Sequence, residues 1–340
     1  MNLGMFSMFT LRDGASQAET FHEWLGLAEL AEEAGLDTVW LGESHFRPQR
    51  AVLSSPLVVA AAVAARTRRI GIGIAVQVLP LANPVRIAEE AAIVDHLSKG
   101  RLIFGVGRSS FLESYAGYNV DYAESRPIFM ECLEIIQRAW NQECFSYDGK
   151  YYQFHDVRLV PRPYQQPHPP MRMAVESRET FGIAGNLGLP IFIRYQLDVS
   201  ELQQLLAEYQ EARHAAGFPG PNDVNLQIPV YVAETREKAL AEPRATTARA
   251  LENRRRMLQG AADAEALDRL TRLSQESYEE MLKRTAYGTP EMVVERLLEF
   301  RETFRLTGFS LDFNPGGQLP YELVVNSMRL MGERVKPKLP

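Results

Sequence analysis

A (β/α)8 TIM barrel, with insertions after strands 4 and 7, is the fold that this 340-residue sequence predicts. Eight short apolar segments recur along the chain. Most of them precede a segment with helical periodicity, which is the pattern of an α/β fold with a parallel sheet. Residues 70–78 form a nearly continuous apolar run, as expected for a strand buried on both faces. The two insertions account for the length above the roughly 250 residues typical of such barrels.

Residues 69–110 show how one unit of this barrel is predicted to form. The apolar run is followed by Asn83-Pro84, and proline suits the first helical position because that N–H has no intrahelical partner. Apolar residues with helical spacing continue from Ile87, Gly100 ends the turn after the helix, and 102–106 is a second buried strand. Two parallel strands joined by a helix form a βαβ unit.

The remaining elements are predicted from the same signals. Period-3.6 apolar spacing indicates the helices, and Gly35, Gly217 and Gly308 mark helix ends. The other predicted strands are 3–9, 38–41, 171–175, 190–193, 225–232 and 309–313, and the other main predicted helices are 19–34, 56–66, 125–140, 199–216, 290–307 and 321–334.

The two insertions differ in character, within what we predict to be a single domain over 1–340. Residues 144–160 alternate aromatic and polar side chains around Asp148-Gly149, which predicts a β-hairpin. Residues 161–170 hold five prolines and predict an extended connection. Residues 235–283 are charged and helical, and 260–285 is predicted to be a mobile lid that excludes water from a site, or else a merely disordered stretch.

Composition excludes several classes of protein. A net charge of −6 argues against a general nucleic-acid binder. Cys132 and Cys144 are the only cysteines, so neither a disulfide framework nor a cysteine metal site is predicted. The first residues lack the pattern of a signal peptide, and no apolar run is long enough to span a bilayer, so we expect a cytoplasmic protein.

A first candidate site combines Arg108 with Glu176, Ser177 and Thr180. Each lies just after a predicted strand, and the carboxyl ends of barrel strands form the active-site face. Arg108 offers a fork of donors that fits phosphate oxygens, and Ser177 and Thr180 begin a helix whose N–H groups favour an anion. Together they predict a phosphate site; the alternative is an ordinary helix cap beside a surface arginine.

A second candidate is Glu43-Ser44-His45, which follows the second strand. A carboxylate and an imidazole there predict proton transfer or substrate positioning near neutral pH. The alternative is that Glu43 and His45 satisfy each other and do no chemistry.

Small residues near the strand ends form a third candidate: Gly73, Ala75, Val76 and Gly105. They would allow the close approach of a flat ligand, or else serve packing inside the barrel. The sequence has no GxGxxG loop, no GxxxxGK[ST] loop and no histidine pair with metal spacing. It therefore supports neither a Rossmann dinucleotide site, nor a P-loop, nor a histidine metal site.

Four segments resemble the bacterial luciferase-like family of flavin-dependent monooxygenases: WLGESHF (40–46), VLPLANPVRIAEEAAIVDHLSKGRLIFGVGRS (78–109), VESRET (175–180) and YGTPEMVVERL (287–297). The resemblance implies the barrel, reduced FMN supplied by a separate flavin reductase, and O2 as cosubstrate for oxygenation of a small organic substrate. It assigns the FMN phosphate to Arg108, Glu176, Ser177 and Thr180. It places Ala75 and Val76 behind the flavin ring, joined by a non-prolyl cis peptide.

The sequence departs from the luciferases at two positions. Luciferases carry two histidines after the glutamate, the first serving as acid/base, whereas this chain has Ser44 and then His45. Gly107 stands where luciferases often have a reactive cysteine. The catalytic set is therefore predicted as Glu43, Ser44 and His45, in the wider family that oxygenates small molecules.

Two other functions stay open. One is an F420-dependent dehydrogenase of the same superfamily. The other is a non-catalytic flavin-binding partner subunit. The resemblance also implies a homodimer through helices 56–66 and 87–97, which are rich in Ala, Val and Ile. Predicted substrate contacts are Phe6, Met8, Phe9, Phe111, Tyr115 and Tyr195.

Overall fold

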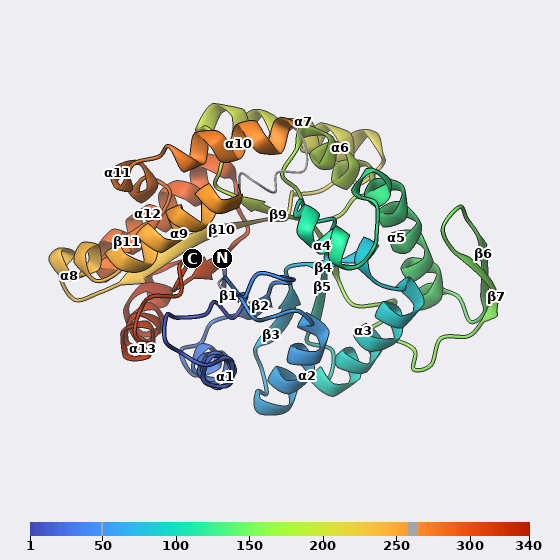
Figure 1. The fold of residues 1–340 in the computed structure, drawn as a ribbon, viewed down its shortest axis with the longest axis horizontal. Helices are drawn as coiled ribbons and strands as arrows, with labels where there is room; N and C mark the ends of the chain where they lie inside the picture. Colours follow the sequence, from blue (N-terminus) through green and yellow to red (C-terminus); the bar gives the residue numbers. More distant parts are fainter. Residues whose placement is uncertain (49, 258–263) are drawn as a thin grey trace.

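The computed structural model describes residues 1–48, 50–257 and 264–340. Within them, eight parallel strands close into a barrel in the order β1-β2-β3-β5-β8-β9-β10-β12, and β12 pairs with β1. The predicted (β/α)8 fold is therefore confirmed (Figure 1). The barrel strands are β1 (Asn2–Ser7), β2 (Thr38–Leu41), β3 (Gly71–Ile74), β5 (Leu102–Gly107), β8 (Met171–Ala174), β9 (Ile191–Arg194), β10 (Val224–Val232) and β12 (Gly308–Asp312).

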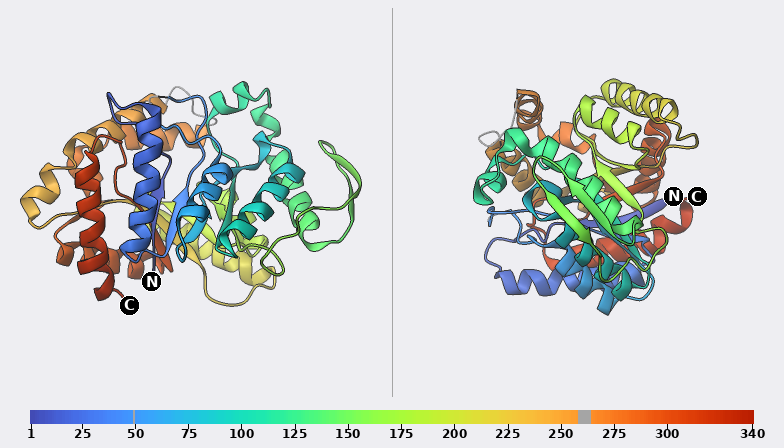
Figure 2. Two further views of the ribbon diagram at one scale, coloured as in Figure 1. Left: turned by 90° about the horizontal axis from the view of Figure 1, so that it is seen from below. Right: turned by 90° about the vertical axis from the view of Figure 1, so that its right-hand side faces the viewer.

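Helices surround the barrel, and the hairpin of β6 (Phe145–Asp148) and β7 (Gln153–Val157) projects from it, as predicted (Figures 1 and 2). The helices are α1 (Gln17–Glu33), α2 (Pro56–Arg66), α3 (Pro84–Ser98), α4 (Leu112–Gly117), α5 (Ser125–Asn141), α6 (Arg178–Asn186), α7 (Val199–Ala215), α8 (Arg236–Ala241), α9 (Arg244–Met257), α10 (Ala264–Ser274), α11 (Tyr278–Leu282), α12 (Pro290–Phe304) and α13 (Tyr321–Leu330).

Local sequence sets the helix ends. Ser16 and Glu19 form a reciprocal capping box at the start of α1, and the Asn83 side chain accepts hydrogen bonds from the backbone N–H groups of Val85 and Arg86 at the start of α3. Several predicted boundaries differ from the structure: β1 ends at Ser7 and not at 9, α13 ends at Leu330 and not at 334, and α12 ends at Phe304 and not at 307. Arg305 adopts the left-handed conformation that closes a helix, and Gly308 already begins β12.

The strand predicted at 70–78 is divided. It forms β3 and the short strand β4 (Gln77–Val78), separated by the predicted cis peptide between Ala75 and Val76. Another short strand, β11 (Ala286–Gly288), pairs in parallel with β10 and was not predicted, because three residues are too few for a visible periodicity.

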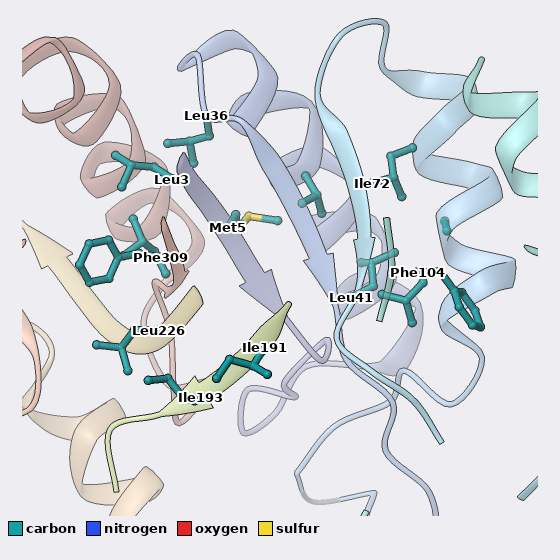
Figure 3. Close-up of a cluster of buried hydrophobic side chains, with 14 of the residues drawn as sticks. Leu3, Met5, Leu36, Leu41, Ile72, Phe104, Ile191, Ile193, Leu226 and Phe309 are labelled. Carbon is teal, nitrogen blue, oxygen red and sulfur yellow. The ribbon is translucent and has the colours of Figure 1, made fainter. Parts of the chain in front are cut away.

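Buried side chains of neighbouring strands form one continuous core, part of which is shown in Figure 3. Leu3, Met5, Ile72 and Phe309 belong to it and are at most 1% exposed. A separate cluster of Phe6, Trp40 and Phe192 is packed by Met8, Ala75 and Val76. This second cluster lies at a cavity described below, because Met8, Ala75 and Val76 all line that cavity.

The predicted lid at 260–285 falls partly on residues 260–263, which lie outside the described residues. From residue 264 onward it contains α10 and α11. None of the helices in the described ranges combines the length and the apolar character that crossing a bilayer requires.

Candidate active site

A cavity of about 190 Å³ opens at the carboxyl ends of the barrel strands. Its walls come from the segments after β1, β2, β3, β5, β8 and β9, so neighbouring strands contribute side by side. This is the face at which barrels of this class bind ligands. The cavity brings together seven of the nine predicted site residues: Glu43, Ala75, Val76, Arg108, Glu176, Ser177 and Thr180.

Ala75 and Val76 form one wall of the cavity, at the bend between β3 and β4. This bend lies tight against β5. A Cβ on Gly107 would lie 2.4 Å from Val76 Cγ2, and a Cβ on Gly105 would lie 2.0 Å from the carbonyl oxygen of Ile74. Glycine at both positions of β5 therefore lets the bend approach, and it also explains why Gly107 is not a cysteine here.

Arg108 enters the cavity from the end of β5. Its guanidinium donates to Ser125 Oγ at 2.9 Å and lies 5.1 Å from the centroid of the Tyr122 ring. The Tyr115 hydroxyl donates to the Arg108 backbone carbonyl. Contacts from α4, from α5 and from the turn at 122–124 thus hold the Arg108 backbone and guanidinium, as a preformed anion-binding group requires.

The start of α6 faces the same cavity. Ser177 is its N-cap, and the Ser177 and Thr180 side chains bond reciprocally to each other's backbone N–H groups. Thr180 Oγ1 also accepts from the Glu176 N–H at 3.1 Å. The unpaired end of a helix carries partial positive charge, so this turn and Arg108 together favour an anion.

Glu43 lies on the cavity wall, but its partner His45 lies behind it. His45 Nε2 is 2.7 Å from Glu43 Oε1, and the two side chains are only 6% and 2% exposed. The Tyr118 hydroxyl lies 3.3 Å from His45 Nδ1. Neither His45 nor Ser44 is among the residues that line this cavity or the one beside it. The buried Ser44 hydroxyl has no hydrogen-bond partner among the described residues.

Gly73 and Gly105 are packing residues and do not face a ligand. A Cβ on Gly73 would lie 1.8 Å from the Trp40 ring, whose edge meets Phe192 with centroids 4.7 Å apart. These rings fill the barrel interior beneath the cavity. Of the small residues singled out in the sequence, only Ala75 and Val76 reach the cavity.

Two of the predicted substrate contacts are wrong. Phe9 is 1% exposed and stacks on Trp24, on the core side of the chain. Tyr115 is also 1% exposed and packs with Val78 and Leu81. The other four predicted contacts line one of the two cavities: Phe6, Met8, Phe111 and Tyr195.

Two charged residues of the site receive no role from the sequence, although Arg194 lies in a loop predicted at the active-site face. Arg126, near the start of α5, lines the cavity and pairs with Glu179 at 2.6 Å. Arg194 lies 3.6 Å from Glu176. Arg194 ends an apolar strand, and this position could have indicated a site residue. Arg126 is one of several charged residues on an amphipathic helix, and nothing in the sequence distinguishes it from the others.

The fold and the cavity define a (β/α)8-barrel protein with a cavity at the carboxyl face of its strands, lined by Arg108 and the start of α6. Residues 1–306 match the family model of the luciferase-like monooxygenases, and the chain belongs to this family. The alkanal monooxygenase alpha chain of Photorhabdus luminescens is 31% identical over 218 residues, which are 64% of this chain and 60% of that relative, less than two thirds of its length.

Two further similarities agree with this assignment. The oxygenase component of a flavin-dependent trigonelline monooxygenase from Acinetobacter baylyi is 25% identical over 241 residues, which are 69% of this chain and 66% of that relative. The crystal structure of the monooxygenase RslO1 from Streptomyces bottropensis matches with a TM-score of 0.84 and 28% identity, covering 99% of each chain.

Proposed function

We propose that this chain is an FMN-dependent monooxygenase that uses reduced FMN and O2 to oxygenate a small organic substrate. The observation that carries the proposal is one cavity holding both the Arg108–α6 anion site and the Ala75–Val76 bend, in a member of the luciferase-like family. Bound reduced FMN would supply two electrons; one atom of O2 would enter the substrate and the other would leave as water.

The residues present fit FMN in charge and in shape. Arg108, the N–H groups at the start of α6, and Arg126 would hold the phosphate, because each offers donors to an anion. Ala75 and Val76 have small side chains and would support the flat ring. The aromatic floor below them, from Trp40 and Phe192, keeps water out of the barrel interior.

Glu43 is the acid/base group that the geometry favours. Glu43 lines the cavity, and its carboxylate side chain is 2% exposed, whereas His45 bonds to that carboxylate from outside the lining. In the proposal, Glu43 is the acid/base group nearest the ligand, and His45 orients its carboxylate through Nε2. The geometry supports no role for Ser44.

Two partners complete the proposal. A separate flavin reductase would supply the reduced flavin, which agrees with the relative described as an oxygenase component. A second copy of the chain would cover neighbouring helices α2 and α3 (Figure 1), where Val58, Ile93 and Leu97 are 67%, 44% and 54% exposed.

Titration of purified protein with FMN, monitored by flavin fluorescence, tests the proposal. Arg108→Ala should weaken FMN binding by about 1.5–3 kcal/mol, the usual contribution of a hydrogen bond to a charged group. Arg138→Ala is the matched control, since Arg138 lies on the outer face of α5 and pairs with Glu134. Equal FMN affinity in wild type and Arg108→Ala would contradict the site assignment.

Two additional measurements address the alternatives. A parallel titration with F420 should give no binding; exclusive binding of F420 would replace the monooxygenase by a dehydrogenase. Oxygen uptake with reduced FMN and a substrate panel should exceed the rate of free flavin, and its failure to do so would favour the non-catalytic subunit.

A further inference from the structure

A second cavity, of about 130 Å³, adjoins the proposed flavin cavity. The two share Met8, Arg194 and Gln196 as common walls, so a molecule in one lies against the contents of the other. Apolar side chains form part of its lining. They come from the barrel interior and from the helices after β10: Phe6, Met8, Ile228, Leu273 and Met281.

The rest of the lining is strongly cationic. Four arginines reach this cavity from segments far apart in the sequence: Arg50, Arg194, Arg254 and Arg284. Arg50 is placed by the loop after β2, which bonds to the loop after β1 through the Leu11 N–H and the Arg50 carbonyl. Arg254 is placed by α9, whose Thr246 hydroxyl donates to Asn314 Oδ1 at 2.7 Å.

Among the described residues that line this cavity, one carboxylate, Asp312, stands beside the four arginines. Arg254 and Arg284 share a single carboxylate, Glu276, at 3.1 and 2.9 Å, and its side chain is 11% exposed. Glu176 lies 3.6 Å from Arg194, and Asp312 is the acidic residue of the lining. The Glu176 and Arg194 side chains are each 33% exposed, so solvent partly screens this pair. A fourth carboxylate, Asp198, is 3.8 Å from Arg284 but is 76% exposed, where solvent screens it.

Burial makes the positive charge of this cluster costly. Loss of hydration lowers the pKa of Arg50 to about 9, with further lowering by the neighbouring charges of Arg194 and Arg47. Burial likewise lowers the pKa of Arg254. Burial raises the pKa of Asp312 to about 7, so near neutral pH this carboxylate only partly compensates the arginines. The cluster of four arginines in the lining would attract an anionic ligand.

Arg284 contacts the segment after β9 and helps to hold it in place. It donates to the Leu197 carbonyl at 2.9 Å and lies over the Tyr195 ring. Arg50 and Arg254 lie apart from the proposed phosphate site, because Arg108, Ser177 and Thr180 line the first cavity and are absent from the lining of the second. Arg50 and Arg254 thus face a space that the proposed flavin site leaves to the substrate.

We infer that the substrate of this protein carries a carboxylate or a similar oxyanion, bound by Arg50 and Arg254. Its apolar part lies against Phe6 and Met8, toward the shared wall with the flavin cavity. The inference rests on the proposed function, since it treats the second cavity as the substrate site of the same enzyme.

Calorimetric titration with two pairs of probes that match in size and differ in charge, benzoate against benzamide and hexanoate against hexanamide, tests the inference. Each carboxylate should bind wild-type protein about tenfold or more tightly than its amide, as expected for charge-assisted hydrogen bonds. Arg254→Gln and Arg50→Gln should each remove that preference. Arg256→Gln should retain it, because Arg256 lies on the same helix, is 57% exposed and pairs with Glu252.

FMN titration of the same samples separates the two hypotheses. Normal FMN binding with no preference for either carboxylate would overturn the inference alone. A carboxylate preference in a wild-type protein that binds no flavin would overturn the proposed function and, with it, the assignment of this cavity to a substrate. If either Arg50→Gln or Arg254→Gln does not fold, the probe titrations of wild type and of the other variant still test the inference.

Discussion

The Glu43 side chain accepts a hydrogen bond from the backbone N–H of Val78 at 3.0 Å. The same oxygen accepts from Gln77 Nε2 at 2.7 Å, while the other oxygen meets His45. A carboxylate from the loop after β2 thus holds β4 in place, directly after the Ala75–Val76 bend. One buried side chain thus positions the wall of the cavity that its own residue lines.

Removing that carboxylate should affect stability and flavin binding together. Glu43→Ala leaves the buried N–H groups of Gln77 and Val78 without their acceptor, which should lower the free energy of unfolding by about 1–3 kcal/mol. Urea denaturation measures this, and FMN affinity should fall in parallel. Glu143→Ala is the control, since Glu143 is 90% exposed in its pair with Arg158 and should change stability by less than about 0.5 kcal/mol.

His45→Gln distinguishes a positioning residue from a catalytic one. Because His45 lies behind Glu43, we expect a loss of stability but less than about a tenfold change in the rate of reduced-flavin oxidation, with an unaltered pH profile of that rate. Stopped-flow absorbance of the flavin follows the reaction. A loss of about 100-fold or more, as for removal of a general acid or base, would assign His45 the direct role instead.

Two glycine substitutions should have opposite signs. Gly73→Ala places a Cβ 1.8 Å from the Trp40 ring and should destabilise the protein by about 1–3 kcal/mol. Gly182→Ala, inside α6, meets no heavy atom within 4 Å and should stabilise it by roughly 0.5–1 kcal/mol, because alanine is the better helix former. Thermal unfolding of both variants checks the pair; equal effects would contradict the packing described for Trp40.

Asp312 should make stability fall as pH rises. Burial raises its folded-state pKa to about 7, against about 3.9 in an unfolded chain. Between these values the folded state retains a proton that the unfolded state has lost, so unfolding becomes easier by up to about 1.4 kcal/mol per pH unit and levels off above pH 7. Asp312→Asn should remove this slope. Urea titrations of wild type and Asp312→Asn at pH 5 and pH 8 test this. The same change in the free energy of unfolding in both proteins would disprove the role of Asp312.

Val58→Glu tests the proposed homodimer. The Val58 side chain is 67% exposed on α2, so a charge there should leave the fold intact but oppose burial against a second copy. Analytical ultracentrifugation should give a dimer for wild type and a monomer for the variant. Val160→Glu, at a position 75% exposed beside the hairpin, should remain dimeric. A monomeric wild type would refute the dimer.

Most elements of the barrel were visible in the sequence because each is determined by local pattern. β2 and α2 have the predicted bounds, and the Asp148-Gly149 turn produced the predicted hairpin. Two features were not predicted: the division of 70–78 into two strands and the three-residue strand β11. Both are too short to produce a hydrophobic periodicity that a window of residues could detect.

The sequence by itself determined the barrel, its family, and the residues that follow individual strands, such as Arg108 and Ser177. These depend on short-range patterns of burial and on strand ends. Tertiary structure alone decided that His45 lies behind Glu43 and that Arg50, Arg254 and Asp312 meet around a second cavity. The physical reason is that closing the barrel brings together loops more than a hundred residues apart, and the charge, burial and pKa of a group depend on all of those neighbours at once.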